Sequence, residues 1–552
     1  MSDRPGDDEL LFLALGGAGE IGMNLNLYGH AGKWLMIDLG ITFGNDRTPG
    51  IDIIMPDPTF VTGRLGDLVG LVLTHAHEDH LGAVPYLWPQ LQCPIYATPF
   101  TAAVLHRKLK ETGLTDHVPI HVVPMSGRFS VGPFELELVT LTHSIPEPNA
   151  VVLRTSVGTI LHTGDWKFDS DPLVGPVSDQ AALRRIGEDG VLAMVCDSTN
   201  ALIEGESGSE ATVRESLVEL IGRYDTRIAV ACFASNVARL ESIAKAAAVH
   251  DRHVALVGRS LWRIVDAARE SGYLTDLPEF VAEHDVGYLP RDKVVMICTG
   301  SQGERRSALA RIARRDHPNV SLESGDVVIF SSRKIPGNER DIAELQNDLI
   351  RLGVQVVTDA DHLVHVSGHP ARAELAQMYQ LVRPRIAIPV HGESRHLAAH
   401  ARLAEECQVG QALVPENGAL IRLAPGPAEI VGEVPSGRLG LDGTNLVRLD
   451  SPQLKTRHRM VFNGAAVATV VLDSAGRLLA DPQVTVQGVF DPEDESANAA
   501  VTAAVREAVT GLPHGLRRDD ATVREAARLA VRRALHASHG KKPVTEVHLV
   551  RI

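Results

Sequence analysis

The feature that most constrains this chain is a cluster of metal-capable side chains in the segment Thr74–Leu81. The segment reads Thr-His-Ala-His-Glu-Asp-His-Leu and supplies four such groups: His75, His77, Asp79 and His80. The apolar run 67–74 that leads into it predicts a buried strand, and α/β proteins place their sites at the carboxyl ends of strands. A single histidine is more often a core or surface residue than a ligand. Imidazole and carboxylate groups at this spacing predict a site for a zinc-class metal.

Further side chains of the same kind follow predicted strands elsewhere in the chain. Strands are expected over 33–38, 134–141, 158–162 and 385–390, and they deliver Asp38, His143, Asp165 and His391. Any one of these residues would be unremarkable, but together with the first cluster they strengthen the metal hypothesis. His391 comes more than 300 residues after that cluster. The middle of the chain is therefore expected to be an insertion into the metal-binding fold, or a cap on it.

The glycine-rich segment 16–22 contains a formal Gly-x-Gly-x-x-Gly motif, and Asp38 lies near the distance at which a dinucleotide-binding fold places its ribose-binding acid. Such a turn must open a helix. Here the next residues alternate through Tyr28, turn over 29–32 and continue into the strand predicted over 33–38. We therefore predict a β-hairpin, reject a nicotinamide site and keep Asp38 as a carboxylate at a strand end.

Composition and charge exclude several classes of protein. No apolar run reaches the ~18–20 residues that span a bilayer, and the polar, acidic N-terminus is unlike a signal peptide. The five cysteines are scattered and form no Cys-x-x-Cys pair, which indicates reduced core residues and a cytoplasmic protein. The formal charge of −15 argues against a general nucleic-acid coat, although it leaves room for a local basic channel.

From about residue 204 the pattern changes to alternating helices and strands. Ser235 and Asn236 come at the amino end of a predicted helix, where they could cap the helix or hold an anion. Ser367 and His369 precede another helix, with Pro370 expected at its first position, so both should lie at a positive helix end. Loops rich in Gly, Ser and Arg, which suit phosphate but are also common turns, follow predicted strands at 299–304 and 331–334.

The last part of the chain is predicted to be a separate module. The Gly- and Pro-rich stretch 425–449 predicts a linker. Beyond it, 450–552 has strands and helices but no catalytic constellation, at a length at which a domain folds alone. We expect this module to mediate assembly, as a homodimer or homotetramer, or to contact RNA; a purely structural role is the alternative.

In these residues the chain resembles the metallo-β-lactamase superfamily and, within it, the β-CASP nucleases. The superfamily motifs match Asp38, His75-x-His77-x-Asp79-His80, His143 and Asp165, and the β-CASP motifs match Asp197, His369 in Ser-Gly-His and His391 in Pro-Val-His-Gly. The match runs in order from Leu10 to about Arg422. The segments most similar to the bacterial ribonuclease J family are 16–22, 197–200, 233–236, 299–304 and 365–369. The C-terminal module fits that family in position and length only.

The resemblance implies an α/β fold. A four-layer αββα metallo-β-lactamase domain would be interrupted by an α/β β-CASP domain and followed by a small C-terminal α/β domain, with nucleic acid in the cleft between the first two. The expected boundaries are 1–204 and 363–424 for the metallo-β-lactamase domain, 205–362 for the β-CASP domain, 425–449 for the linker and 450–552 for the C-terminal domain.

The resemblance also implies two zinc ions per chain, with Mn²⁺ or Mg²⁺ as alternatives in activity. His75, His77 and His143 would hold one ion, Asp79, His80 and His391 the other, Asp165 would bridge them, and Asp38 would orient ligand imidazoles. His369, supported by Asp197, would protonate the leaving 3′-oxygen or stabilise the phosphorane, and we count both with Asp79 as catalytic. Phosphates, including a 5′-monophosphate, would be held by His365, Ser367, His369, Ser235 and Asn236.

The implied activity is that of a 5′→3′ exoribonuclease with some endonuclease activity, acting in rRNA processing and mRNA decay. A metal-activated water would hydrolyse the phosphodiester and leave 5′-phosphates, preferably on 5′-monophosphorylated single-stranded RNA. One alternative is a DNA-processing β-CASP enzyme, whose relatives tend to carry Val in place of His391. Others are a small-molecule metallohydrolase, which would lack the insertion and the Ser-Gly-His motif, and a metal-dependent scaffold that binds RNA.

Overall fold

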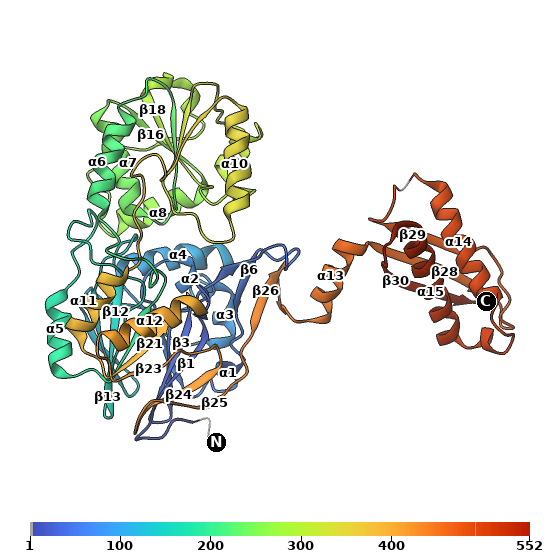
Figure 1. Ribbon diagram of the computed structural model, residues 1–552, viewed down its shortest axis with the longest axis horizontal. Helices are drawn as coiled ribbons and strands as arrows, with labels where there is room; N and C mark the ends of the chain where they lie inside the picture. The colour runs from blue at the N-terminus through green and yellow to red at the C-terminus, as the bar shows by residue number, and fades with distance from the viewer. Residues whose placement is uncertain (1–3, 492) are drawn as a thin grey trace. The chain divides into compact units, whose positions relative to one another are not determined.

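The computed structural model describes residues 4–491 and 493–552, which form two compact units. The first unit runs from the start of the described chain to Thr42 and from Met55 to Gly437, and the second holds Phe43–Ile54 and Arg438–Ile552 (Figure 1). No helix among the described residues is both long enough and apolar enough to cross a membrane. The predicted metal ligands all belong to the first unit.

One sheet of the first unit has eight strands in the order β25-β24-β1-β3-β4-β7-β8-β9. Its strands are β25 (Glu429–Glu433), β24 (Ala419–Ala424), β1 (Leu10–Gly16), β3 (Leu25–His30), β4 (Lys33–Ile37), β7 (Leu68–Val72), β8 (Ile95–Ala97) and β9 (Ile120–Val122). Strands β1, β3 and β4 pair antiparallel in succession. The predicted hairpin is therefore confirmed, and the glycine-rich segment opens no helix.

A second sheet has seven strands in the order β10-β11-β12-β13-β14-β21-β23. Its strands are β10 (Arg128–Val131), β11 (Phe134–Thr140), β12 (Asn149–Thr155), β13 (Gly158–His162), β14 (Ala193–Asp197), β21 (Ile386–Val390) and β23 (Gln411–Ala412). Strands β13, β14 and β21 are parallel neighbours. Because their carboxyl ends meet at one edge of the sheet, residues far apart in sequence come together there.

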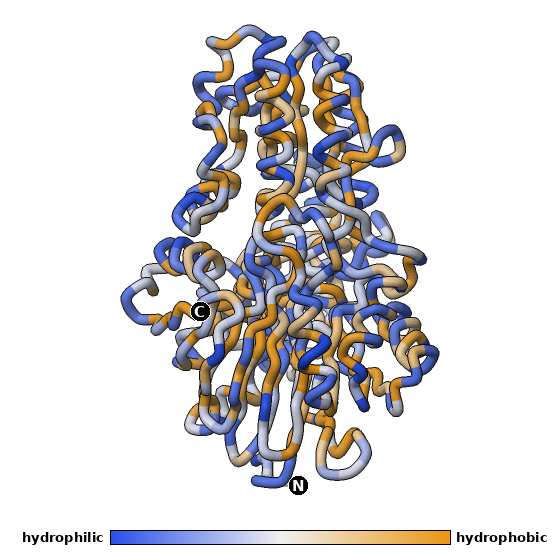
Figure 2. The backbone as a smooth tube through the Cα atoms, turned by 90° about the vertical axis from the view of Figure 1, so that its left-hand side faces the viewer, coloured by the Kyte–Doolittle hydropathy of each residue, from blue (hydrophilic) through white to orange (hydrophobic). Residues whose placement is uncertain are grey.

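The two sheets pack face to face across a shared apolar core that includes Phe12, Leu35, Leu153 and Ile388. Strand β1 is buried over its whole length, as a strand covered on both faces requires. Hydrophobic stretches follow the strands of both sheets (Figure 2). The outer faces are covered by α3 (Val84–Leu91) and α4 (Pro99–Thr112) on the first sheet and by α5 (Gln180–Asp189), α11 (Arg372–Val382) and α12 (Ser394–Glu406) on the second. The four-layer αββα architecture is confirmed.

The insertion leaves after β14 and returns to β21, which lies directly beside β14. It holds a parallel six-stranded sheet in the order β17-β16-β18-β15-β19-β20. Its strands are β17 (Val281–Ala282), β16 (His253–Val257), β18 (Val294–Cys298), β15 (Ile228–Ala231), β19 (Val327–Phe330) and β20 (Gln355–Val357). Its helices are α6 (Glu210–Ile221), α7 (Val237–Val249), α8 (Arg259–Glu270), α9 (Ala308–Ala313) and α10 (Glu339–Arg351).

The second unit contains two small sheets. One is the four-stranded sheet of β27 (Asn445–Arg448), β26 (Arg438–Asp442), β6 (Ile53–Pro56) and β5 (Thr42–Phe43). The other joins β29 (Gln483–Gln487), β28 (Ala465–Leu472) and β30 (Val544–Arg551), and a core of its own packs it against α14 (Glu495–Thr510) and α15 (Asp520–His539). A separate C-terminal α/β module is confirmed.

Three local expectations need correction. The stretch 425–449 is not an irregular linker, because it forms β25, β26 and β27, and its Gly and Pro residues serve the turns between these short strands. The helix after Pro370 begins at Arg372 with Ala371 as its N-cap, so Pro370 lies before the helix rather than at its first position. Helices α5, α12 and α13 (Pro452–Asn463) fall where no helix is predicted.

Candidate metal centre

The predicted ligands reach one place from separate parts of the first unit. His75 and His77 follow β7, His143 follows β11, Asp165 follows β13 and His391 follows β21. Asp79 and His80 lie on α2 (Glu78–Leu81), a single helical turn whose N-cap is His77, so the end of the cluster is helical rather than a loop. Each site residue thus comes from the region just beyond a strand.

A first group brings together His75, His77, His143 and Asp165, with their ligand atoms within 4.8 Å of one another. His77 Nδ1 lies 3.0 Å from His75 Nε2 and 3.1 Å from His143 Nε2. Ligand atoms that bind one zinc tetrahedrally at ~2.0–2.1 Å are themselves about 3.3 Å apart. Burial lowers the pKa of all three imidazoles, that of His77 to about 4, and so favours the neutral, metal-binding form.

A second group brings together Asp79, His80, Asp165 and His391. His391 Nε2 is 3.1 Å from Asp79 Oδ2, and His80 Nε2 is 3.1 Å from Asp165 Oδ2. Burial acts to raise the pKa of both carboxyl groups, but His80 and His391 outweigh it and hold each pKa below its usual range. Burial acts to lower the pKa of the two imidazoles, and the carboxylates outweigh it and raise both. The carboxylates therefore favour positive charge at the position where a metal cation would bind.

Asp165 belongs to both groups and carries an observation that points to a cation. Its Oδ1 is buried and accepts no hydrogen bond from any described residue, although His391 Nδ1 lies 3.5 Å away. A buried acceptor without a donor is unfavourable by ~1–3 kcal/mol, more when it is charged. The donor set therefore suits metal binding, and Asp165 is common to both groups.

The other ring nitrogens of the ligands are held as well. Asp38 Oδ2 lies 2.7 Å from His80 Nδ1, and Asp38 also accepts hydrogen bonds from Thr74 N and Oγ1. His75 Nδ1 is 3.0 Å from Thr74 Oγ1, and His143 Nδ1 is 2.5 Å from the Gly368 carbonyl oxygen. Contacts of this kind fix ring orientation and so aim the remaining nitrogen at a metal.

The glycine-rich segment 16–22 has a place at this site. The His391 backbone N–H donates to the Gly17 carbonyl oxygen at 2.6 Å, and β2 (Ala18–Gly19) pairs with β22 (Gly392–Glu393). His391 itself adopts a left-handed backbone conformation, with φ of 51°. A non-glycine residue holds such a conformation only where its surroundings impose it. The motif that mimics a dinucleotide turn thus supports the most distant predicted ligand.

His369 and Asp197 lie beside the second group. His369 Nδ1 is 2.8 Å from Asp197 Oδ2 and 3.8 Å from Asp165 Oδ2. Burial acts to lower the pKa of His369, but the charge and hydrogen bond of Asp197 outweigh it and raise the pKa above its ordinary value. The His369 side chain is 22% exposed, whereas Asp197 is fully buried. The pair therefore places at the edge of the site an imidazole whose proton is held more tightly than usual.

The predicted phosphate-binding residues are only partly brought together. Ser367 accepts hydrogen bonds from the His369 backbone N–H and from Asn200 Nδ2. His365 Nδ1 is buried and has no partner among the described residues. Asn236 caps α7, because its Oδ1 accepts from the Arg239 backbone N–H at 2.9 Å. No hydrogen bond in the described chain joins Asn236 or Ser235 to the segment 365–369.

Arg333 is a candidate functional residue that sequence reasoning missed. Its guanidinium donates to Asn200 Oδ1, and Asn200 Nδ2 donates in turn to Ser367 Oγ and to the His369 carbonyl oxygen. Arg333 is half-buried, burial lowers its pKa, and it pairs with no carboxylate among the described residues. The basic loop 331–334 was the available signal, but the sequence does not say which cation of that loop turns inward.

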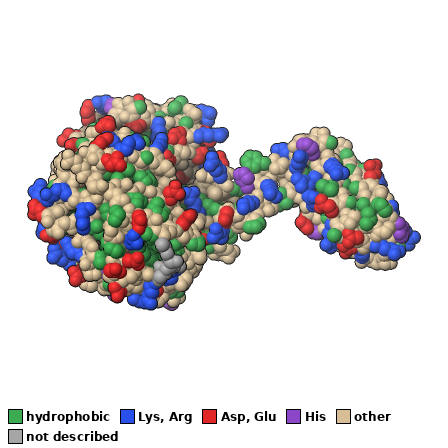
Figure 3. Space-filling view, turned by 60° about the horizontal axis from the view of Figure 1, so that its bottom comes forward, with side chains coloured by type: hydrophobic (Ala, Val, Ile, Leu, Met, Phe, Trp, Pro, Cys, Tyr) green, Lys and Arg blue, Asp and Glu red, His purple; other side chains and the backbone are tan. Residues whose placement is uncertain are grey.

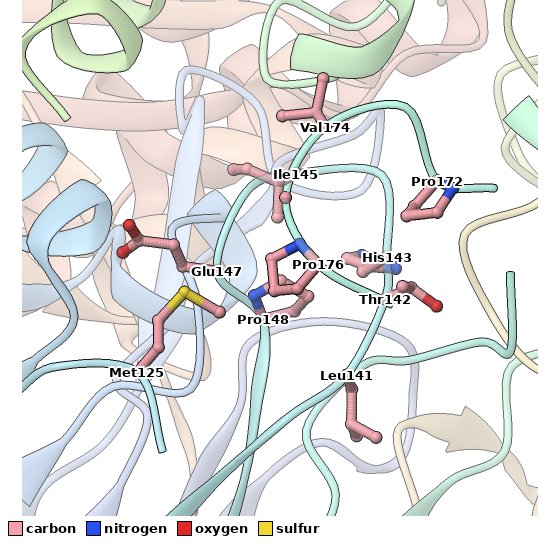
Figure 4. A pocket seen from close by; sticks show the side chains of 11 residues that line it. Met125, Leu141, Thr142, His143, Ile145, Glu147, Pro148, Pro172, Val174 and Pro176 are labelled. Atoms are coloured by element: carbon pink, nitrogen blue, oxygen red, sulfur yellow. The ribbon is translucent and has the colours of Figure 1, made fainter. Parts of the chain in front are cut away.

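A small cavity beside His143 is lined by the loop that carries this histidine and by a proline-rich segment after Asp165 (Figure 4). Thr142 and Glu147 line it from the histidine loop, with Pro172 and Pro176 opposite. Glu147 is buried and accepts from the Phe100 backbone N–H and the Tyr273 hydroxyl. These contacts anchor the loop a few residues after His143.

Family models cover most of the chain in order. The matches are the metallo-beta-lactamase superfamily over residues 22–218, the ribonuclease J beta-CASP domain over 225–349, the Zn-dependent metallo-hydrolase RNA specificity domain over 353–415 and the ribonuclease J C-terminal domain over 452–552. The last of these extends the likeness to the C-terminal module, where the sequence supports it only by position and length.

Curated relatives match most or all of the chain. Ribonuclease J of Sinorhizobium meliloti is 47% identical, with 100% of this chain and 99% of the relative covered. Ribonuclease J of Mycobacterium tuberculosis is 41% identical over 88% of each. Among solved structures, a protein of unknown function from Enterococcus faecalis matches 75% of this chain with a TM-score of 0.52 and 17% identity, which supports the fold alone.

Proposed function

The chain belongs to the ribonuclease J family, and on that premise we propose that it is a zinc-dependent 5′→3′ exoribonuclease with some endonuclease activity. Family membership already makes it a hydrolytic ribonuclease with a metal-binding site and an RNA substrate. The observation that carries the finer proposal is the meeting of two ligand groups at Asp165, with the Asp197–His369 pair beside them. The metal ligands would then serve nucleophile activation, and the Asp197–His369 pair would serve leaving-group protonation.

We assign the ligands as the geometry groups them. His75, His77 and His143 would hold one zinc ion and Asp79, His80 and His391 the other, with Asp165 shared by both groups and Mn²⁺ or Mg²⁺ as alternatives in activity. Two such ions supply Lewis acidity and lower the pKa of a bound water. Asp38 and Thr74 keep the imidazoles aimed at the site.

The protein's own residues account for proton delivery and position. Asp197 holds His369 through Nδ1, which leaves Nε2 for the substrate. As the water oxygen bonds to phosphorus and the bond from phosphorus to the 3′-oxygen breaks, His369 gives its proton to that oxygen. The scissile phosphate stays on the 5′-oxygen of the shortened RNA, and the released nucleotide leaves with a 3′-hydroxyl. Such a general acid contributes roughly 10²–10⁴ in rate.

Phosphates of the RNA are taken by the segment 365–369, with His365, Ser367 and His369, together with Arg333. Arg333 supplies a half-buried charge with no carboxylate partner in the described chain, and Asn200 links it to Ser367. Guanidinium groups suit phosphate because they donate in a fixed fork. Ser235 and Asn236 remain assigned to the same phosphates, although Asn236 uses its carbonyl oxygen as a helix cap. A 5′-monophosphate there would set the register of stepwise cleavage.

The C-terminal module is proposed to assemble the protein into a homodimer or homotetramer. Helix α13 buries only Leu454 and exposes Met460, Val461 and Phe462 at 41%, 62% and 57%. Residues 450–552 carry 14 Lys and Arg against 12 Asp and Glu, so the module is slightly basic in an acidic chain. Lys, Arg and His side chains are spread over its visible face (Figure 3). Apolar exposure favours assembly, and the charge favours RNA contact.

The experiment that tests this proposal is incubation of the zinc-loaded protein with 5′-labelled single-stranded RNA. We expect labelled mononucleotide from the first time points and no product with chelator. Labelled 5′-terminal fragments longer than a mononucleotide, with no labelled mononucleotide, would replace the exonuclease with an endonuclease. Cleavage of matched DNA but not RNA would favour the DNA-processing alternative. In the cell the same activity would serve rRNA processing and mRNA decay in the cytoplasm.

A further inference from the structure

The four consecutive residues 197–200, which begin at the last residue of β14, have side chains that each contact a different partner. Asp197 contacts His369, Thr199 contacts His391, and Asn200 contacts Ser367 and Arg333. Ser198 alone turns away from the site, into the core. The segment 197–200 therefore joins the proton donor, a metal ligand and the phosphate-binding residues, and its position matters for all three.

Ser198 is the anchor of this segment. Its Oγ lies 2.8 Å from His400 Nδ1, and His400 Nε2 lies 2.9 Å from the Tyr379 hydroxyl. Ser198 and His400 have no exposed surface, and Tyr379 is 3% exposed. The three residues come from the end of β14, from α12 and from α11, so the contact joins the second sheet to both helices that cover it.

The arrangement resembles a hydroxyl–imidazole–hydroxyl triad, but it is not a nucleophilic site. Ser198 Oγ is sealed from solvent, so no substrate can reach it. Burial lowers the pKa of His400 to about 4 and raises the pKa of Tyr379 well above its usual value. The hydrogen-bonded chain Ser198–His400–Tyr379, called the relay below, is therefore neutral across the working pH range. A neutral hydrogen-bonded chain in the core fixes geometry rather than transferring protons.

Two backbone features show how closely Ser198 is placed against the site. A Cβ on Gly392 would meet Ser198 Cβ at 3.1 Å, a tight contact, so the two segments lie close together. The residue before that glycine is His391, with its left-handed backbone. A shift of Ser198 therefore presses on the backbone of a metal ligand as well as moving Asp197.

We propose that His400 is a positioning residue, which acts through Ser198 to hold Asp197 against His369 and Thr199 against His391. This inference rests on the proposed function, because it concerns the efficiency of the same site. The competing view is that the relay only stabilises the fold. The two views predict different effects on activity. If His400 positions the site, only its contact with Ser198 should affect catalysis, because Ser198 adjoins the site and Tyr379 does not.

Two substitutions of His400 separate the halves. In His400→Asn the amide occupies the place of Nδ1 and keeps a partner for Ser198, whereas in His400→Gln it occupies the place of Nε2 and keeps one for Tyr379. Each variant loses one buried hydrogen bond, so they are matched in stability. Ser198→Ala should follow the Gln variant, and Tyr379→Phe should follow the Asn variant.

We expect kcat for RNA cleavage to fall by about tenfold or more in His400→Gln, a fraction of what a general acid contributes, with KM and Tm close to those of His400→Asn. His400→Asn should keep kcat within about threefold of wild type, since the Ser198 contact survives. Equal loss of kcat in both variants, or no loss in the Gln variant, would overturn the proposal.

Crystal structures of the two variants provide a readout that does not depend on activity. The Asp197–His369 contact, 2.8 Å in the wild type, should persist in His400→Asn and lengthen in His400→Gln. If the wild type failed to cleave RNA, the proposed function would fall, and the structures would still decide the role of His400. An unchanged contact in His400→Gln would refute positioning.

Discussion

The Asp197→Asn substitution removes the charge that keeps His369 protonated while preserving side-chain shape. Asp197 Oδ2 is 2.8 Å from His369 Nδ1, and both groups are withdrawn from solvent. The carboxylate raises the pKa of His369 against the effect of burial. Without that charge, burial and the neighbouring His391 act to lower the pKa of His369, and the Asp165 carboxylate opposes them. The variant should therefore lose the acid form of His369 at a lower pH than the wild type.

The size of the effect follows from the lost contact. A hydrogen bond to a charged group contributes about 1.5–3 kcal/mol, which corresponds to roughly a 10- to 150-fold change in the ratio of protonated to neutral His369. Above the pKa of His369, kcat/KM should fall by the same factor. Below it, excess protons restore the acid form and the loss should shrink. The alkaline limb of the pH–rate profile should thus move to lower pH.

The assay is kcat/KM for 5′-monophosphorylated RNA from pH 6 to pH 9, with metal content measured on the same samples. Thr199→Val is a comparison variant of unchanged charge, because it removes a second contact to Asp197 together with the contact to His391. A loss that is equal at all pH values would contradict the proton-donor role. Loss of a metal ion would show instead that Asp197 is a ligand, as its place in a third group with Asp165, His369 and His391 would permit.

Three further outcomes are expected. His77→Ala and Asp79→Ala should each abolish RNA cleavage and lower metal content while the circular dichroism spectrum stays that of the wild type; full activity in either would contradict the ligand assignment. Arg333→Ala should raise KM for RNA about tenfold, with a partial effect in Arg333→Lys, because a charge-assisted contact to phosphate contributes roughly 1.5 kcal/mol or more; an unchanged KM measured by steady-state kinetics would remove Arg333 from the phosphate site. RNA with a 5′-monophosphate should be degraded faster than the same RNA with a 5′-triphosphate in a parallel time course, and equal rates would count against a 5′-phosphate pocket.

The sequence predicts the ligand cluster well because the constraint there is local. His75, His77, Asp79 and His80 are joined by a few bonds, so their spacing alone limits what they can do. The strands that deliver the other ligands are also visible, since fully buried strands are apolar along their length. The prediction of a linker over 425–449 is wrong for the opposite reason. Its Gly and Pro residues signal turns, and short edge strands between turns leave little hydrophobic pattern.

The residues that sequence reasoning missed act through contacts between distant segments. The basic loop 331–334 does not single out Arg333, and His400 has no distinguishing local pattern. Each reaches the segment 197–200 only through the fold. That meeting depends on β14 and β21 being parallel neighbours, because their adjacent ends place Asp197 and His391 side by side. The insertion can then be long without disturbing the metal ligands, since it leaves and re-enters at the same sheet edge. Strand β19 of the insertion ends in the loop that carries Arg333, and the Arg333 side chain places a positive charge near the site. The same connection that interrupts the metal-binding domain would therefore supply the proposed phosphate-binding group, so that chemistry and substrate recognition would meet at the segment 197–200.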